Sequence, residues 1–371
     1  MLVDRVASKK HSKPIMARSF ITGASGFIGY HTAKQLVARG DQVACLVRRS
    51  SNTKHLQTLG VTLVYGDVTD PTGLSEAIEG CDQVYHVAGR TSSLDRKGFY
   101  SVNEQGTRNV LEACVTQPNR PTVVFVSSLS ATGPAQSGDQ PLDESAAPAP
   151  VSFYGRSKLA GEKVALEFAD RVPITIVRPP IVLGENDLQG LMMFSSIAKT
   201  RIHIVPGMGK FHYSVIHAAD LVHLMLLAAE RGTRLTPVDS ETSPSSSGYY
   251  HAVSESLTYS ELGRQIGQAL GVRTRIVPTL PRSVWVIAAF NQMMMQLTRR
   301  TTYLCMDKAR EVRAGHWLAT AEKAKEELGY EPALPLAERL EQTARWYRRE
   351  GLIPAIRHRR QKHADSLSHS K

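Results

Sequence analysis

The chain is predicted to form a doubly wound, mostly parallel α/β sheet with helices on both faces. Three observations predict this fold: short apolar segments alternate with helical ones, the first apolar segment runs into a glycine turn, and the segment after that turn has the pattern of a helix ending at Gly40. A length of 371 residues suits one large unit or two domains with an ample core. A smaller C-terminal region, from about Gly184 onward, is expected to close over the carboxyl ends of the strands.

The first strand ends at Phe20-Ile21 and leads into Gly23, Gly26 and Gly29. Between a strand and a helix, such glycines permit a tight turn, a close approach of bare backbone to a pyrophosphate, and close helix packing. The helix N-terminus then faces the phosphates. The first interval is one residue longer than in Gly-x-Gly-x-x-Gly, and the alternative is a tight turn without a ligand. The context favours a dinucleotide site.

The second strand, residues 42–47, ends in Arg48-Arg49. An acidic residue at this strand end would bind the adenosine ribose of NAD, whereas an arginine accommodates the 2′-phosphate of NADP. The acidic residues that follow, Asp67 and Asp70, come at the end of the next strand, residues 61–66, and not at the end of this one. Two solvated basic residues are the alternative interpretation. The sequence therefore predicts NADP as the cofactor, with NAD as the alternative. A fourth strand is predicted at residues 82–89.

Tyr154 and Lys158 are four residues apart, a spacing that places both side chains on one face of a helix. A phenol titrates near pH 10, and a nearby ammonium group favours the phenolate and lowers that pKa. The pair could act as a general acid/base, although such pairs are common and a solvated helix face is the alternative. The chain also contains the glycine turn and Ser127-Ser128 after an apolar strand, and these motifs favour a catalytic role for Tyr154 and Lys158.

Together these motifs resemble the extended short-chain dehydrogenase/reductase superfamily, which is NAD-dependent epimerase/dehydratase-like, over about residues 18–352. The matching segments occur in the family's order: Thr22-Gly-x-x-Gly-x-x-Gly29, Asp67-Val68, His86-Val-Ala-Gly89, Asn103-Glu-Gln-Gly-Thr107, Ser127-Ser128, Tyr154-x-x-x-Lys158 and Arg178-Pro179.

The resemblance implies that Tyr154 is the general acid/base and that Lys158 binds the nicotinamide ribose and lowers the pKa of Tyr154. It also implies that the Ser128 hydroxyl polarises the substrate oxygen, with Ser127 the neighbour most easily confused with it. Many relatives have Ala where this chain has Gly89. Besides Arg48, Tyr154 and Lys158, the residues expected to contact the cofactor are Gly23, Ser25, Gly26, Phe27, Ile28, Gly29, Asp67, Val68, Ala88, Gly89 and Pro179.

The substrate class depends on the segment 207–220. Nucleotide-sugar epimerases and dehydratases usually carry Arg-Asp-Phe there, and this chain has Phe211-His-Tyr-Ser214 without an arginine. Lys210 or His212 could substitute. The C-terminal pattern, which includes Asp307-Lys308-Ala-Arg-Glu, resembles the 3β-hydroxysteroid dehydrogenase and dihydroflavonol reductase branch, whose enzymes interconvert a secondary alcohol and a ketone on hydrophobic substrates.

Two other function classes are alternatives to this one. The first is an NAD-dependent nucleotide-sugar epimerase or dehydratase, which Arg48 and the missing arginine disfavour. The second is a redox sensor or scaffold on the same fold, which would be expected to lose Tyr154 or Lys158.

Charge and composition divide the chain into four parts: a basic, disordered extension at residues 1–16, a Rossmann domain at 17–183, a substrate-binding region at 184–354 interleaved with the last Rossmann strands, and a basic, disordered tail at 355–371. The net charge is +11, to which the two ends contribute +3 and +4. Most of the positive charge therefore lies at the two ends of the chain, and it indicates no nucleic-acid groove. Met16 is an alternative start.

The four cysteines are scattered without a C-x-x-C pair, which predicts neither a metal site nor a disulfide framework and fits a reducing, cytoplasmic location. Relatives commonly form homodimers through residues 100–115 and 155–170.

The apolar segment 281–300 has two interpretations. It is interrupted by Asn291-Gln292 and too short to span a bilayer, and basic residues flank it. A helix packed over the substrate cavity, with methionines as adaptable filler, is favoured. Peripheral membrane contact, with Trp285 and Phe290 as interfacial anchors, is the alternative.

Overall fold

The structure is a computed structural model, and it describes residues 16–206, 209–237, 246–302 and 304–354. The predictions for residues 1–15 and for the tail 355–371 lie outside this range.

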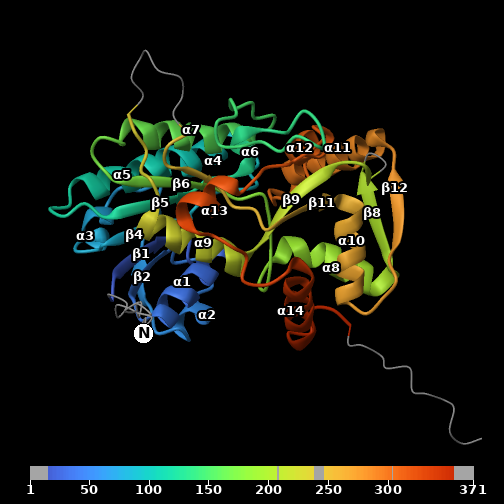
Figure 1. The fold of residues 1–371 in the computed structure, drawn as a ribbon, viewed down its shortest axis with the longest axis horizontal. Coiled ribbons are helices and arrows are strands. Elements are labelled where there is room, and N and C mark those ends of the chain that lie inside the picture. Colours follow the sequence, from blue (N-terminus) through green and yellow to red (C-terminus); the bar gives the residue numbers. More distant parts are fainter. Residues whose placement is uncertain (1–15, 207–208, 238–245, 303, 355–371) are drawn as a thin grey trace, which may run out of the picture.

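A seven-stranded parallel sheet forms the larger part of the fold (Figure 1), which confirms the predicted fold class. Its strand order is β10-β6-β5-β4-β1-β2-β3, so the order reverses direction between β1 and β4. Ligands of doubly wound sheets bind at such a point, beyond the carboxyl ends of the strands. The strands are β1 (Arg18–Thr22), β2 (Gln42–Val47), β3 (Thr62–Tyr65), β4 (Gln83–His86), β5 (Thr122–Val126), β6 (Ile174–Arg178) and β10 (Tyr249–His251).

Helices cover both faces of this sheet. The central strands are accordingly buried along nearly their whole length, as expected for parallel strands covered on both sides. One face carries α1 (Phe27–Arg39), α9 (Ala218–Arg231) and α13 (Glu322–Leu328), and the other carries α3 (Leu74–Ile78), α5 (Gly106–Val115) and α7 (Phe153–Glu167). Shorter helices lie between them: α2 (Lys54–Gln57), α4 (Arg96–Tyr100), the π-helix η1 (Ser101–Gln105) and α6 (Leu129–Thr132).

A second region lies beside the sheet on the right of Figure 1 and has its own apolar core. Two small sheets build it: β11-β9-β7, from β7 (Ile181–Leu183), β9 (His212–His217) and β11 (Glu255–Thr258), and β12-β8, from β8 (Ile202–Pro206) and β12 (Arg275–Thr279). Its helices are α8 (Leu188–Thr200), α10 (Tyr259–Ala269), α11 (Pro281–Thr298), α12 (Met306–Arg313) and α14 (Leu336–Arg349). Between β9 and β11 the chain returns to the main sheet as β10.

Several predicted element boundaries differ from the structure by a few residues. The first helix begins at Phe27, within the predicted glycine turn, because Gly26 is already its N-cap. The fourth strand ends at His86, because the Val87 amide turns back to the Tyr85 carbonyl, at 3.1 Å. The second strand occupies the predicted residues 42–47.

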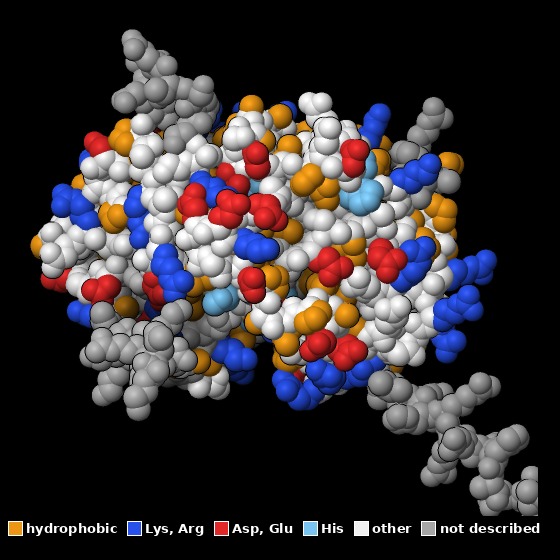
Figure 2. Space-filling model, viewed as in Figure 1, with side chains coloured by type: hydrophobic (Ala, Val, Ile, Leu, Met, Phe, Trp, Pro, Cys, Tyr) orange, Lys and Arg blue, Asp and Glu red, His pale blue; other side chains and the backbone are white. Residues whose placement is uncertain are grey.

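Charged side chains are unevenly distributed on the face shown in Figure 2. Acidic side chains gather near its middle, over α13, and Lys and Arg side chains line the edge that β8, β12 and α10 form. No helix among the described residues is long and apolar enough to cross a membrane. The four cysteines are free and buried, and the described part of the chain holds no cluster of His, Cys, Asp and Glu side chains suited to a metal ion.

Candidate active site

The glycine turn lies against the loop that follows β4. Gly23 has φ +73°, and a Cβ built there would lie 2.7 Å from the Ala88 amide nitrogen. A Cβ on Gly29 would lie 2.2 Å from the Gly23 carbonyl oxygen. Both contacts are too close for any side chain, so only glycine lets the turn, α1 and the β4 loop meet here.

The N-terminus of α1 is open to an anion. Gly26 is its N-cap, no side chain caps it, and its first turn contains no acidic residue. The first-turn amides of a helix lack intrahelical acceptors and carry the positive end of the helix dipole. Ser25, Phe27 and Ile28 are half-buried around this turn. A pyrophosphate fits such a site.

A buried chain of hydrogen bonds connects the two loops with η1. The Ala88 amide donates to Thr22 Oγ1 at 3.1 Å. Thr22 Oγ1 contacts His86 Nδ1 at 2.7 Å, and the Thr22 hydroxyl is the donor there because the proton of the neutral ring lies on Nε2, which faces the Thr107 hydroxyl. His86 Nε2 then donates to Thr107 Oγ1 at 3.0 Å, and that hydroxyl donates to the Asn103 carbonyl at 2.9 Å. Burial lowers the pKa of His86 to about 3, so its ring is neutral and keeps one donor and one acceptor.

The predicted adenosine-side residues follow β2 and β3. Arg48 and Arg49 are exposed at the end of β2, where the Arg49 guanidinium lies 5.5 Å from the centre of the Tyr65 ring. Asp67 is half-buried and its Oδ1 accepts from the Thr69 amide at 3.0 Å. Val68 is buried, and its carbonyl accepts from Asn109 Nδ2 at 2.8 Å. The strand ends that carry these residues emerge at the same edge of the sheet as Thr22, which pairs with Leu46 and His86.

Lys158 is buried on α7 with its ammonium group directed at the end of β5. Its Nζ donates to the Val126 carbonyl at 2.8 Å and lies 4.7 Å from the centre of the Phe125 ring. Burial lowers the pKa of Lys158 to about 8, against the attraction of Glu162. A Cβ on Gly89 would lie 3.6 Å from Nζ, which is ordinary contact, so an alanine fits there as well.

Tyr154 lies in the first turn of α7 and is half-buried. A residue from the far end of the chain holds this turn: Asp307 accepts from the Phe153 amide at 2.7 Å and from the Tyr154 amide at 3.0 Å. Ser152 caps the helix through the Gly155 amide and donates to Glu311 at 2.7 Å. Both acids are on α12, and sequence reasoning did not assign them a role.

Asn103, in η1, is a further residue that sequence reasoning noted only as part of a motif. Its side chain donates to Ser157 Oγ at 2.8 Å and to the Arg90 carbonyl at 3.0 Å, and accepts from the Arg90 amide at 2.7 Å. Ser157 in turn donates to the Tyr154 carbonyl at 2.7 Å. Asn103 therefore ties the loop after Gly89 to the helix that carries Tyr154 and Lys158.

The two neighbouring serines differ in what their hydroxyl hydrogens do. Ser127 donates to Glu162 Oε1 at 2.5 Å, and Glu162 also forms a buried ion pair with Arg178 at 2.6 Å. Ser128 instead accepts from the Ser130 amide at 3.1 Å as the N-cap of α6. That bond uses a lone pair of Ser128 Oγ and not its hydrogen, so the hydroxyl can still donate to a substrate oxygen.

Contacts between α6 and α7 bring Ser128 toward Tyr154. A Cβ on Gly155 would lie 2.3 Å from the Ser130 carbonyl oxygen, so only glycine allows this approach. The Leu129 amide donates to the buried Pro179 carbonyl at 2.9 Å, which places the segment after β6 beside the same loop.

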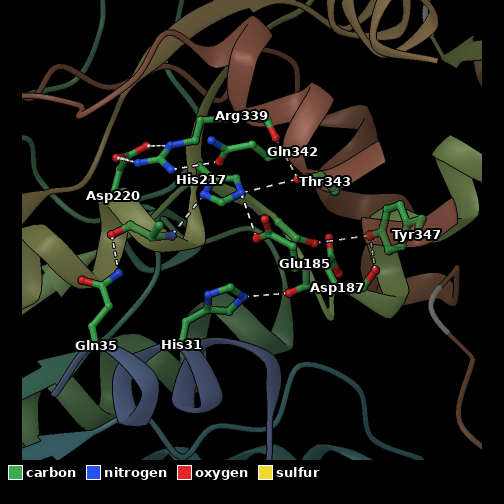
Figure 3. A network of polar contacts seen from close by, with 12 residues as sticks. His31, Gln35, Glu185, Asp187, His217, Asp220, Arg339, Gln342, Thr343 and Tyr347 are labelled. Atoms are coloured by element: carbon green, nitrogen blue, oxygen red, sulfur yellow. Dashed lines mark hydrogen bonds and ion pairs between the residues drawn. The ribbon is translucent and has the colours of Figure 1, made fainter. Parts of the chain in front are cut away.

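Figure 3 shows a polar network that joins α1 to the second region behind this segment. His31 on α1 contacts the Glu185 carbonyl at 2.7 Å, and the Glu185 carboxylate contacts His217 at 3.3 Å. Burial raises the pKa of Glu185, but the hydrogen bond and charge of His217 outweigh it and bring the pKa to about 2. Burial raises the pKa of Asp187, two residues further, to about 6, and Tyr347 on α14 donates to its carbonyl at 2.5 Å. The loop that follows β7 is therefore held from both sides.

The residues present fit a nicotinamide dinucleotide. The uncapped N-terminus of α1, the close-packed glycines and the cations after β2 suit its phosphates. Lys158 lies beside Gly89, where the nicotinamide ribose is expected.

Comparison with known proteins identifies the family. The model of the NAD dependent epimerase/dehydratase family matches residues 19–238, more than half of the chain. The chain belongs to this family. The predicted superfamily, and an NAD(P)-dependent enzyme acting on CH–OH groups, are thereby confirmed.

Two relatives refine the comparison. A ceramide reductase from Caulobacter vibrioides is 28% identical over 334 residues, which are 90% of this chain and 95% of the relative. A decarboxylating sterol-4-alpha-carboxylate 3-dehydrogenase from Dictyostelium discoideum is 28% identical over 228 residues, 58% of this chain and 69% of the relative. Both names denote oxidoreductases and not nucleotide-sugar epimerases, which agrees with the predicted branch.

A solved structure, the dTDP-glucose 4,6-dehydratase DesIV from Streptomyces venezuelae with NAD bound, has a TM-score of 0.69 at 24% identity. It covers 91% of this chain and 98% of its own, and this likeness concerns the fold alone.

Proposed function

We propose that this protein is an NADP-dependent oxidoreductase that interconverts a ketone and a secondary alcohol on a hydrophobic substrate of steroid-, flavonoid- or lipid-like chemistry. The observation that supports the proposal is the packing of α7, which carries Tyr154 and Lys158, against α6 and the loop after β5, which carries Ser128 with its hydroxyl hydrogen still available. The names of the ceramide and sterol relatives support a hydrophobic substrate.

In the proposed reaction, the nicotinamide when bound supplies or accepts the hydride. The Ser128 hydroxyl donates to the carbonyl oxygen and orients it, and the Tyr154 hydroxyl gives that oxygen its proton as negative charge develops. The Lys158 ammonium holds positive charge beside them and stabilises the phenolate that remains. In the oxidation direction, Tyr154 takes the proton back.

NADP is proposed over NAD because Arg48 and Arg49 occupy the end of β2 and no acidic residue stands there. Arg48→Ala should weaken NADPH binding by about 1.5–3 kcal/mol, the range for a hydrogen bond to a charged group, and leave NADH binding nearly unchanged. Fluorescence titration with both cofactors measures this difference. An equal loss for both, or a preference of the unaltered protein for NADH, would overturn the assignment.

A panel of substrates tests the reaction itself. Steroid ketones, a dihydroflavonol, 3-oxo lipids and nucleotide sugars are offered with NADPH and with NADH, and oxidation of the reduced nicotinamide is followed by absorbance. Turnover of a hydrophobic ketone supports the proposal. Turnover or micromolar binding of a nucleotide sugar, abolished by Lys210→Ala, would favour the epimerase alternative.

The proposal also includes an oligomeric state and a location in the cell. A homodimer through residues 100–115 and 155–170 is tested by light scattering, and a cytoplasmic location by fractionation of cells.

A further inference from the structure

The face of α11 that points away from the protein is apolar. Val286, Phe290, Met293 and Leu297 are between 52% and 71% exposed, and their spacing of four, three and four residues places them on one stripe of the helix. Six of the twelve large hydrophobic side chains exposed in the described part of the chain lie between residues 280 and 297. Of the two side chains expected as interfacial anchors, Phe290 is exposed and Trp285 is half-buried.

The opposite side of α11 is firmly attached. Ala288 and Met295 are fully buried, and Asn291 Nδ2 donates to the Leu304 carbonyl at 2.8 Å, just before α12. The exposed stripe is therefore a fixed surface on a packed helix, which we call the α11 stripe.

The sequence around the α11 stripe has charge of one sign. Residues 262–306 contain six arginines and no aspartate or glutamate. Forty-five residues without a carboxylate, in a chain where acids are otherwise frequent, indicate a surface that faces negative charge.

A cationic cleft opens at the C-terminal end of α11. Its volume is ≈ 670 Å³, and its cations are Arg90, Lys97, Arg299 and Arg300. Hydrogen bonds join its two walls, from Gln296 to the Leu94 carbonyl at 3.1 Å and from Ser92 to the Thr302 carbonyl at 3.2 Å.

Ion pairs to the described residues do not balance the charge of these four cations. Within the described ranges none of them forms an ion pair. The carboxylate that lines the cleft, Asp95, caps α4 by accepting from the Gly98 amide at 2.8 Å. Cations gathered without an anion repel one another, and a phosphate group accepts several such donors at once.

We propose that the α11 stripe and the cationic cleft dock this protein on a bilayer that contains anionic lipids. The stripe lies at the boundary of the acyl chains, and the cleft takes a lipid phosphate. A bilayer offers apolar surface and phosphate side by side, as this surface does. A second copy docked by two-fold symmetry would instead bring the same arginine-rich surfaces together, cation against cation. This inference goes beyond the proposed function and does not depend on it.

The proposed docking surface is connected to the helix that carries Tyr154 through α12. The α11 helix packs on α12, and Asp307 of α12 holds the Tyr154 amide.

Vesicle flotation with the full chain tests the proposal. The vesicles are phosphatidylcholine alone or phosphatidylcholine mixed with phosphatidylglycerol. The unaltered protein should float with the mixed vesicles and much less with phosphatidylcholine alone. Phe290→Asp with Leu297→Asp should reduce binding at least tenfold. Arg299→Ala with Arg300→Ala should reduce binding to mixed vesicles about 25-fold, because each cation near an anionic surface contributes roughly fivefold.

The matched control is Arg264→Ala with Arg273→Ala, which removes two arginines of the same stretch away from the cleft and should change binding less than fivefold. NADPH binding serves as the check that each variant is folded. All variants keep both basic ends of the chain. Binding that survives the changes at 290, 297, 299 and 300 would place the contact at those ends and overturn the proposal. So would a dimer that Phe290→Asp with Leu297→Asp converts to monomers.

Discussion

Asp307 should be a positioning residue for Tyr154, and its replacement is the sharpest test of how the C-terminal region serves the active site. Its buried carboxylate accepts from two first-turn amides of α7, at 2.7 and 3.0 Å. Hydrogen bonds to a charged group contribute roughly 1.5–3 kcal/mol each. Arg310 shares the same carboxylate at 3.1 Å and would find water instead, which offsets part of the loss. Asp307→Ala should therefore lower the free energy of unfolding by about 3 kcal/mol.

The effect on turnover should be separate and larger. A displacement of the phenol by about 1 Å reduces the rate by roughly 10²-fold, because the proton donor no longer aligns with the substrate oxygen. Urea unfolding measures the stability, and steady-state kinetics separate kcat from the KM for NADPH. We expect kcat to fall about 10²-fold while that KM changes less than threefold, since the glycine turn is untouched.

Two controls distinguish positioning from general loosening. Asp307→Asn keeps one acceptor oxygen. Its loss of unfolding free energy should be about half of that in Asp307→Ala, and its kcat should be higher than in that variant. Arg310→Ala removes a partly exposed ion pair, and its effect on stability should stay within about 1 kcal/mol. If Asp307→Ala loses stability but keeps its full kcat, the carboxylate merely caps the helix and the reasoning fails.

Three further outcomes are expected. Tyr154→Phe should lower kcat by 10²–10⁴-fold, the range typical of a general acid/base, with cofactor affinity nearly intact; a residual kcat above about a tenth would exclude the role. Lys158→Met should raise the free energy of unfolding of the cofactor-free protein below pH 8 by at most about 3 kcal/mol. The reason is that the pKa of Lys158 in the native protein, about 8, lies below its ordinary value of 10.5, and each pKa unit corresponds to about 1.36 kcal/mol. Between pH 8 and 10.5 the unfolded chain keeps the proton that the native chain has released, so the unaltered protein gains stability with pH and the advantage of the variant disappears; a pH-independent difference in urea midpoints would contradict this. Glu162→Gln should cost about 3–5 kcal/mol, because it leaves Arg178 buried without its counterion, and a loss below about 1 kcal/mol would show that water reaches the pair.

Local patterns predicted those parts of the site whose residues are near one another in the sequence. The glycines after β1, the arginines after β2 and the pair Tyr154 and Lys158 each carry their own geometry, because a turn or a helix fixes their spacing. The fold class followed from the same alternation of strands and helices.

The parts that escaped prediction depend on contacts between distant segments. Asp307 lies more than 150 residues from the helix it holds, and no period or motif links the two. The resemblance assigned the role to Ser128 and not to Ser127, but the physical reason for the difference is the contact of Ser127 with Glu162, which lies on α7. The outward direction of Phe290 depends on which face of α11 meets α12, and an apolar helix with small residues on several sides leaves that choice open.

The hydrogen-bond chain through His86 also constrains how this protein can change over time. Every link in it points the same way, from the Ala88 amide through Thr22, His86 and Thr107 to the Asn103 carbonyl. A replacement at one position leaves its neighbour with a buried donor facing a donor, or an acceptor facing an acceptor. Positions 22, 86 and 107 should therefore be energetically coupled, so that changing two of them together has an effect on stability that differs from the sum of the single changes.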